Sequence, residues 1–233
     1  MVGIIVQLAI SWLLIWVIEK KDLSVLGLKP TRQRIFDLGL FFIVTGCCAG
    51  SGFLIRMCLG ERWELNPDFT LRLLAEGLWW NIKSVLFEEL IFRGVILYIL
   101  IKRTGMLKGI IISAIAFGIY HWFTYEVLGN TTPMITVFLI TGLIGLLYGY
   151  GYAKTFSLYI PIGIHIGWNF TNNFIFSEGQ IGNGVLVAVK TNQQASVSYF
   201  IFFMIIFLPM LTMTVVNYLL IRRKKQVVLD DKK

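Results

Sequence analysis

Long runs of apolar residues fill most of this chain, and they limit its possible folds more than any other feature of the sequence. A run of about 18 or more apolar residues is long enough to cross the hydrocarbon core of a bilayer as a helix. The 233 residues are 57% hydrophobic and 15% charged, a composition that excludes an ordinary soluble globular domain. We predict seven membrane-spanning helices, which cover residues 2–18, 38–55, 77–101, 106–123, 133–153, 157–176 and 197–221.

The connections between the predicted helices are short, and this limits what else the chain can contain. No second folded domain fits between them, so we predict a single all-α membrane domain, a polytopic helical bundle, over residues 1–233. For the same reason the net charge of +8 does not indicate nucleic-acid binding. The lipid bilayer is therefore the expected surrounding of the protein, and the sequence leaves its oligomeric state open.

Basic residues are distributed unevenly among the connections. Lysine and arginine collect on the cytoplasmic side of short membrane loops. The connections around Lys20, Arg103 and Lys154, together with the tail that begins at Arg222, hold most of the 21 Lys and Arg residues. We therefore predict an integral protein of the cell membrane, with its N-terminus outside and its C-terminus in the cytoplasm.

Aromatic residues near the ends of predicted helices are a second marker of the membrane boundary. Trp and Tyr are enriched where the bilayer meets water. Trp79 and Trp80 begin the third predicted helix, and Tyr148, Tyr150 and Tyr152 lie at the end of the fifth. We expect these five residues to belong to the two aromatic belts.

The third predicted helix also contains ionisable residues that a bilayer should exclude, namely Glu88, Glu89 and Arg93. A charge at the centre of a spanning helix costs roughly 2.5 to 3.5 kcal/mol even on a lenient insertion scale, so these groups must face one another or a wet cavity. At 100° per residue, Arg93 lies about 40° from Glu89 and about 140° from Glu88 around the helix. We predict a Glu89–Arg93 ion pair, which would leave Glu88 suited to take a proton from water.

Two other predicted helices carry the chain's only histidines, His121 and His165, and Asn169 follows one turn after His165. Residues four apart share a helix face, so His165 and Asn169 can present hydrogen-bond donors to one point. With Glu88 and His121, they offer a base, a partner that orients it and two donors for an oxyanion. Those are the parts that hydrolysis of a peptide bond by water requires.

Each of these residues also has a purely structural interpretation. Glu89 and Arg93 could join two helices, a membrane histidine often makes one interhelical hydrogen bond, and an asparagine often serves to hold helices together. Two other functions stay open for the set. One is a proton-coupled transporter in which Glu88, His121 and His165 form a relay, and the other is a non-catalytic membrane scaffold. The sequence has no broken-helix or inverted-repeat pattern that would favour a transporter.

Three ordered motifs resemble those of the CPBP family, the CAAX proteases and bacteriocin-processing proteins that are also called Abi proteins. The family motifs EExxxR, FxxxH and HxxxN are matched by EELIFRG at 88–94, FGIYH at 117–121 and PIGIHIGWN at 161–169. The similarity covers residues 77–176, which would be the catalytic core. If the protein is a non-catalytic scaffold, this resemblance implies a role in bacteriocin immunity.

The resemblance implies an all-helical intramembrane endopeptidase that cleaves a membrane-associated or lipidated protein or peptide. By motif position, Glu88 and His121 would activate the attacking water. His165 and Asn169 would stabilise the oxyanion, and Glu89 with Arg93 would support the site. The identity of the substrate does not carry over with the motifs.

No cofactor is expected, because Glu88 can serve as the base without a metal ion. The alternative is a zinc ion bound by Glu88, His121 and His165, which are side chains that zinc accepts. The HExxH zinc motif does not occur in the sequence, and the three ligands would come from separate helices.

Overall fold

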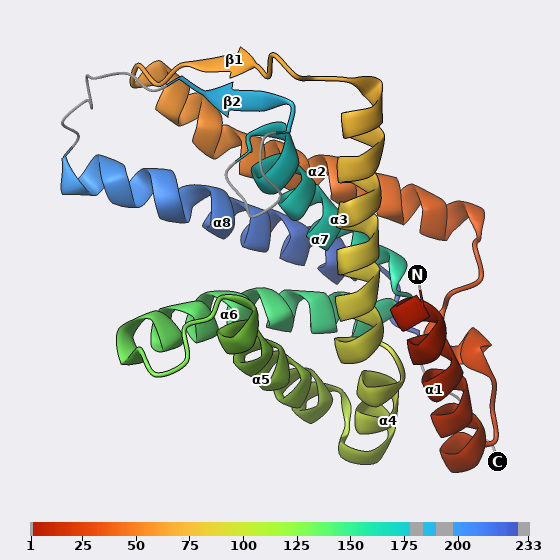
Figure 1. Cartoon of the computed structure of the whole chain (residues 1–233). Helices are drawn as coiled ribbons and strands as arrows, with labels where there is room; N and C mark the ends of the chain where they lie inside the picture. Colours follow the sequence, from red (N-terminus) through yellow and green to blue (C-terminus); the bar gives the residue numbers. More distant parts are fainter. Residues whose placement is uncertain (1, 178–183, 190–197, 228–233) are drawn as a thin grey trace. The chain divides into compact units, whose positions relative to one another are not determined.

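The computed structural model describes residues 2–177, 184–189 and 198–227. Helices dominate this part of the chain (Figure 1). A short 3-10 helix, Leu23–Leu26, follows the first helix, a π-helical turn, Thr171–Ile175, follows the seventh, and two strands, β1 (Trp63–Leu65) and β2 (Leu186–Ala188), pair in antiparallel fashion. The α-helices are α1 (Val2–Glu19), α2 (Arg32–Cys58), α3 (Leu71–Phe92), α4 (Val95–Thr104), α5 (Met106–Thr124), α6 (Thr131–Thr155), α7 (Tyr159–Phe170) and α8 (Tyr199–Arg222).

Five helices, α1, α2, α5, α6 and α8, are long and apolar enough to cross a membrane. They coincide with five of the seven predicted spans, and residue 197, where the last predicted span begins, lies outside the described residues. The chain is therefore an integral membrane protein with an all-α architecture. The other two predicted spans differ from the prediction, each for a local reason.

The third predicted span, 77–101, is not one helix. It is divided between α3 and α4, and the break lies at Arg93 and Gly94. Gly94 adopts φ −79° and ψ −132°, and a Cβ atom there would lie 2.1 Å from the carbonyl oxygen of Leu90. A larger residue could not take this conformation, so the glycine permits the chain to turn directly after the EExxxR motif.

The sixth predicted span, 157–176, changes its helix type before it ends. The α-helical part, α7, has 12 residues and runs directly into the π-helical turn. The backbone N–H of Phe176 donates to the carbonyl of Thr171, which is the five-residue spacing of a π-helix. Such single turns occur often at functional sites, and this one follows Asn169 by two residues.

The chain forms two compact units. Unit 1 consists of Met1–Asp37, Leu86–Ile162 and Tyr218–Lys233, and unit 2 consists of Leu38–Val85 and Gly163–Asn217. The boundary between the units falls within α2, α3, α7 and α8. The single domain over 1–233 and the catalytic core over 77–176 both stay predictions.

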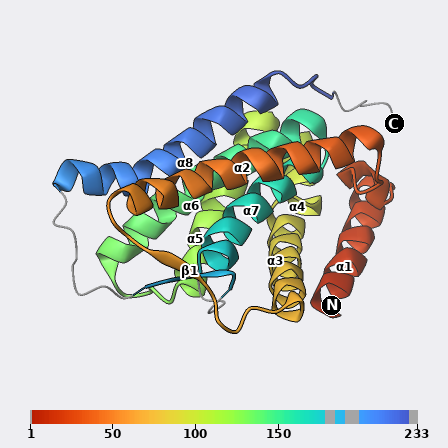
Figure 2. The same cartoon turned by 90° about the horizontal axis from the view of Figure 1, so that it is seen from above.

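In unit 1, α5 and α6 pack as an antiparallel pair and lie side by side in both views (Figure 1, Figure 2). Small residues allow the two backbones to approach closely. A Cβ atom at Gly118 would lie 2.7 Å from the ring of Phe138, and one at Gly145 would lie 3.2 Å from Cα of Ala114. This close pair carries His121 on α5, and both of its helices contact Arg93.

The connections predicted to be cytoplasmic contact one another in unit 1. The carboxylate of Glu19, at the end of α1, pairs with Lys102 and Arg103 at the end of α4. The backbone N–H of Val227 donates to the carbonyl of Lys154, and the side chain of Lys224 pairs with Asp37, which lies near the start of α2. The basic connections of unit 1 are thus gathered at a single end of several helices.

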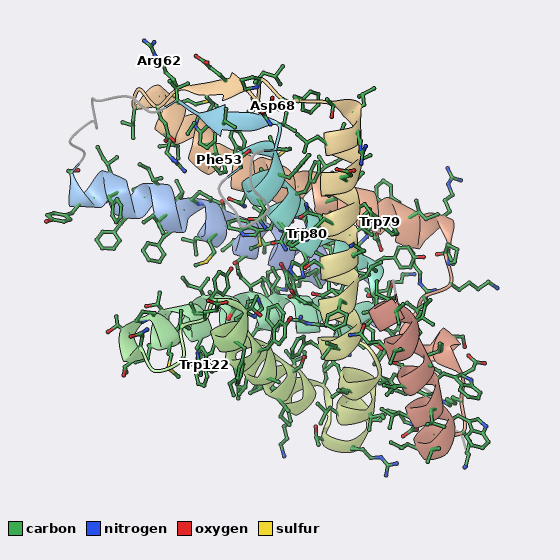
Figure 3. The ribbon with its side chains drawn as sticks, in the orientation of Figure 1. Phe53, Arg62, Asp68, Trp79, Trp80 and Trp122 are labelled. Carbon is green, nitrogen blue, oxygen red and sulfur yellow. The ribbon has the colours of Figure 1, made fainter. Side chains whose placement is uncertain are left out.

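In unit 2, an aromatic cluster lies against the two strands, with Phe53 of α2 beneath them (Figure 3). The rings of Phe53 and Phe176 are stacked with centroids 3.8 Å apart, and Trp63 meets both rings edge-on. A Cβ atom at Gly77 would lie 2.1 Å from the ring of Phe174. These contacts pack the π-helical turn against α2, β1 and α3, and so fix the end of the helix that carries His165.

Candidate active site

The predicted pair of Glu89 and Arg93 is present at the end of α3. Nη1 of Arg93 lies 3.2 Å from Oε1 of Glu89, and both side chains have no exposed surface. The backbone N–H of Arg93 also donates to the carbonyl of Glu89, at 2.8 Å, so the last helical hydrogen bond is kept before the chain turns at Gly94. A fully buried pair at i, i+4 explains how a membrane segment tolerates these two charges.

The guanidinium group of Arg93 is held between α5 and α6. Its Cζ atom lies 4.0 Å from the ring centroid of Phe117 and 5.0 Å from that of Tyr148, both within the range of cation–π attraction. Nη2 of Arg93 donates to the carbonyl of Gly145 at 3.3 Å. A Cβ atom at Gly145 would lie 3.3 Å from that same nitrogen, so a larger residue there would crowd the guanidinium.

Glu88 faces His121 in unit 1. Nε2 of His121 lies 3.9 Å from Oε2 of Glu88, and each side chain is only 10% exposed. Nδ1 of the histidine lies 2.8 Å from the carbonyl oxygen of Phe117. Because a carbonyl oxygen can only accept, this contact assigns the ring hydrogen to Nδ1 and leaves Nε2 of the neutral imidazole as an acceptor. The four-residue spacing of the FxxxH motif thus sets the tautomer of its histidine.

Aromatic residues surround the imidazole of His121. The ring centroids of Phe117, Tyr120 and Tyr125 lie 4.4, 5.4 and 5.8 Å from that of the histidine. Tyr125 follows the last residue of α5, and burial together with the nearby Glu88 carboxylate raises the pKa of its hydroxyl. The phenol therefore stays protonated beside the carboxylate and can act as a donor.

Tyr148 contacts Arg93 in this site, although the sequence predicts a different position for it. Tyr148 and Tyr152 were expected in an aromatic belt, and that prediction is wrong for both, since they are 1% and 0% exposed. They lie on the helix face that packs inward, and Tyr148 contacts Arg93. The signal that could have found it is the pair Gly145 and Gly149, which brackets Tyr148 and marks the closely packed face of α6.

In unit 2, the packing of α7 determines which way His165 and Asn169 face. Cβ atoms at Gly163 and Gly167 would lie 2.7 and 2.5 Å from carbonyl oxygens of α2, so the backbones of α7 and α2 are in close contact along this side. At 100° per residue, His165 and Asn169 lie on the opposite side of α7. The two side chains therefore share a face that α2 does not cover.

The candidate residues fall into two sets. Unit 1 brings together Glu88 with His121 and Glu89 with Arg93, whereas unit 2 places His165 and Asn169 on one face of α7. The convergence of the two sets on one substrate stays a prediction. A zinc ion would draw Glu88 and His121 from unit 1 and His165 from unit 2, so that alternative also stays untested.

A comparison with family models gives a match in the central part of the chain. Residues 70–171 match the family described as "Type II CAAX prenyl endopeptidase Rce1-like". This segment contains the three predicted motifs and overlaps most of the predicted core, 77–176. No curated protein and no solved structure matches the chain.

Proposed function

Because residues 70–171 place the chain in the Rce1-like family of type II CAAX prenyl endopeptidases, which hydrolyse peptide bonds, we propose that it cleaves its substrate within the membrane by activation of a water molecule. The family assignment supports the reaction class, which is hydrolysis of a peptide bond. The geometry in unit 1 supports the assignment of the water-activating groups to Glu88 and His121.

Glu88 and His121 suit this role because both present acceptors to the same place. Oε2 of Glu88 and Nε2 of His121 are 3.9 Å apart, which is too far for a hydrogen bond between them. A water molecule can donate one hydrogen to each atom. As its oxygen attacks the scissile carbonyl carbon, Glu88 takes one proton and later gives it to the leaving amine, so that the carboxylate is regenerated.

Glu89 and Arg93 support the base without taking part in proton transfer. The guanidinium of Arg93 is engaged by Glu89, by the carbonyl of Gly145 and by the rings of α5 and α6. A cation held in this way neutralises one of the two adjacent carboxylates. Glu88 can then act as the base of the pair, while Glu89 remains the counter-ion.

His165 and Asn169 are the proposed oxyanion donors. Attack by water converts the scissile carbonyl into a tetrahedral oxyanion, which needs donors that are already in position. Both residues lie on the face of α7 opposite the contact with α2, and Asn169 is partly exposed. The tight packing of α7 at Gly163 and Gly167 restricts its movement, which favours such a preorganised arrangement.

The proposed substrate is a membrane-associated or lipidated peptide or protein. A site within apolar helices is reached from the bilayer, and a prenyl chain would partition there with the peptide that carries it. The unlipidated alternative is a peptide whose own apolar helix enters from the membrane. The location in the cell membrane, with the N-terminus outside, is proposed on the distribution of basic residues.

The facing pair of Glu88 and His121 within the family segment is the observation that carries this proposal. The test uses the purified full-length protein in proteoliposomes, a prenylated CAAX peptide and an unlipidated transmembrane peptide, with products identified by mass spectrometry. Glu88→Gln should lower the cleavage rate by about 10²-fold or more, since loss of a general base costs about 10² to 10⁴. Glu76→Gln, the same change on an exposed residue of α3, should cleave like the wild type.

A Glu88→Gln variant that cleaves as fast as the control would exclude Glu88 as the base. A wild-type protein that cleaves neither peptide, but moves protons across sealed vesicles, would favour the transporter instead. A protein that cleaves neither peptide, and whose effect on the cell is unchanged by Glu88→Gln and by Glu76→Gln, would favour the scaffold.

A further inference from the structure

Tyr125 is the most exposed of the three aromatic residues that surround the imidazole of His121. Its ring centroid lies 5.8 Å from that of the histidine, and the two ring planes are tilted by 31°. Phe117 is 2% exposed and Tyr120 is half-buried, whereas Tyr125 is 53% exposed. The Tyr125 ring therefore contacts the imidazole while about half of the residue's surface stays open.

The backbone holds Tyr125 in this position. Its N–H donates to the carbonyl of His121 at 3.0 Å, so both the backbone and the ring of Tyr125 contact the same residue. In the connection that follows, the N–H of Val127 donates to the carbonyl of Trp122 at 3.0 Å, and that of Asn130 donates to the carbonyl of Val127 at 3.1 Å. The turn is closed by its own hydrogen bonds, which keeps Tyr125 beside the histidine.

A substrate must bring its scissile carbonyl to the proposed water-activating pair, Glu88 and His121. These two side chains are each only 10% exposed. A peptide that reaches them approaches through an exposed part of their surroundings, and Tyr125 is the exposed ring in contact with the histidine. A substrate residue next to the scissile bond would then lie against this ring.

The connection of residues 125–130 favours an uncharged apolar group at this place. It contains no Lys or Arg that could pair with a carboxylate, and Glu126 is its one charged residue. An aromatic ring gains hydrophobic and dispersion energy when an aliphatic or aromatic side chain covers it. The open part of Tyr125 thus suits a leucine-like side chain better than a charged one.

We propose that Tyr125 is a specificity-determining residue, whose ring binds an apolar side chain of the substrate next to the scissile bond. This inference rests on the proposed peptidase function and names one recognition feature of its substrate. The contribution comes from the ring, so it requires an aromatic side chain at position 125 and does not require the hydroxyl.

The test uses the full-length protein in proteoliposomes and peptides that the wild type cleaves, in which Leu is exchanged for Ala at one residue flanking the scissile bond. For each enzyme, the ratio of kcat/KM between the Leu and the Ala peptide is measured. This ratio does not depend on the amount of active enzyme, so a partial loss of folded protein leaves it unchanged. The wild type should favour Leu by about 10-fold at one of the two flanking residues, since Leu has three more carbons to bury.

Tyr125→Ala should lower this ratio to about two-fold, whereas Tyr125→Phe should keep it, because phenylalanine retains the ring. Phe123→Ala is the matched control. Phe123 is 61% exposed on α5, and at 100° per residue it lies about 160° from His121 around the helix. The control variant should therefore keep the wild-type ratio.

A Tyr125→Ala enzyme with the wild-type ratio would overturn the inference, and so would a wild type without preference at either flanking residue. An equal fall of the ratio in Tyr125→Phe or in Phe123→Ala would contradict a specific role of the Tyr125 ring. Each of these results leaves the proposed function intact, because cleavage by the wild type and its loss in Glu88→Gln are measured with the same peptides.

Discussion

Nε2 of His121 lies 3.9 Å from Oε2 of Glu88, while Nδ1 of the same ring is held at 2.8 Å by the carbonyl of Phe117. The histidine is thus fixed at one nitrogen by its own helix and presents the other to a carboxylate on α3. A backbone carbonyl four residues earlier performs the orienting role that a carboxylate has in many histidine-dependent sites.

His121→Asn should separate the effects of these two nitrogens. An asparagine amide can still donate to the carbonyl of Phe117 in place of Nδ1, but it has no counterpart of Nε2. We expect a folded protein whose kcat falls by about 10² to 10⁴, the range for loss of one general acid–base group. Peptide cleavage and the thermal midpoint measure the two effects, and retention of wild-type kcat would remove His121 from water activation.

The ion pair of Glu89 and Arg93 should contribute to stability as well as to catalysis. Arg93→Gln leaves a carboxylate buried without its partner, which we expect to lower the free energy of unfolding by about 3 to 5 kcal/mol. Arg72 provides a matched control, because it pairs with Glu76 at the same spacing on the same helix but is 86% exposed. Arg72→Gln should leave the unfolding curve unchanged, since exposed pairs add little.

The free energies of unfolding of Arg93→Gln and Arg72→Gln are compared in mixed micelles. The double variant Glu89→Gln/Arg93→Gln is expected to recover part of the stability lost in Arg93→Gln, because no isolated charge remains. Equal losses in Arg93→Gln and Arg72→Gln would contradict a special role of burial.

Much of this site follows from spacing along a helix, and the rest depends on contacts between segments far apart in the sequence. The pair of Glu89 and Arg93 could be predicted because residues four apart meet on any helix. Tyr148 could not be assigned, because its contact with Arg93 depends on the packing of α6 against the end of α3. The aromatic-belt prediction failed there since a tyrosine near a helix end looks the same whether it faces lipid or protein.

The boundaries of the helices also divide into those that the sequence predicts and those that it does not. Hydrophobic length predicted α1, α2, α5, α6 and α8, because their boundaries depend on the bilayer. The break at Gly94 and the π-helical turn depend on local backbone geometry inside apolar stretches, where hydropathy carries no information about helix type. The pairing of β1 with β2 joins segments more than a hundred residues apart, which no local pattern reveals.

Asn169 should matter to catalysis while its neighbour Asn172 should not. The side-chain nitrogen of Asn172 already donates to the carbonyl of Trp168 at 2.8 Å, within its own helical segment. Asn169→Ala should lower kcat by about 10² to 10³ with little change in KM, as expected for a donor used mainly in the transition state. Asn172→Ala should keep kcat within about three-fold, and a similar loss in both variants would contradict an oxyanion role for Asn169.

Chelation should leave cleavage unchanged if Glu88 is the base without a metal ion. The measurement is the cleavage rate after dialysis against a zinc chelator, together with the metal content of the purified protein. Glu88, His121 and His165 have the side-chain types that zinc accepts, so loss of activity that added zinc restores would establish the zinc alternative. His165→Ala would then abolish metal binding, whereas in the metal-free mechanism it lowers kcat alone.

The orientation of the protein in the membrane can be tested at two ends of unit 1. The basic connections are tied together by contacts such as those of Glu19 with Arg103 and of Val227 with Lys154, so they should share one side of the membrane. Positive residues favour the cytoplasmic side. The loop between α5 and α6, residues 125–130, contains no Lys or Arg and should therefore lie outside.

The orientation can be measured with single cysteines placed at Glu126 and Lys225. Their reaction with a membrane-impermeant maleimide in whole cells shows which of the two residues lies outside. Cys47, Cys48 and Cys58 must first be replaced, because the structure leaves two of them exposed. Glu126→Cys should react in intact cells, and Lys225→Cys should react only after the membrane is opened, because the first lies in a loop without basic residues and the second in the basic tail. The reverse pattern would place the N-terminus in the cytoplasm, and labelling of both in intact cells would mean that the chain inserts in two orientations.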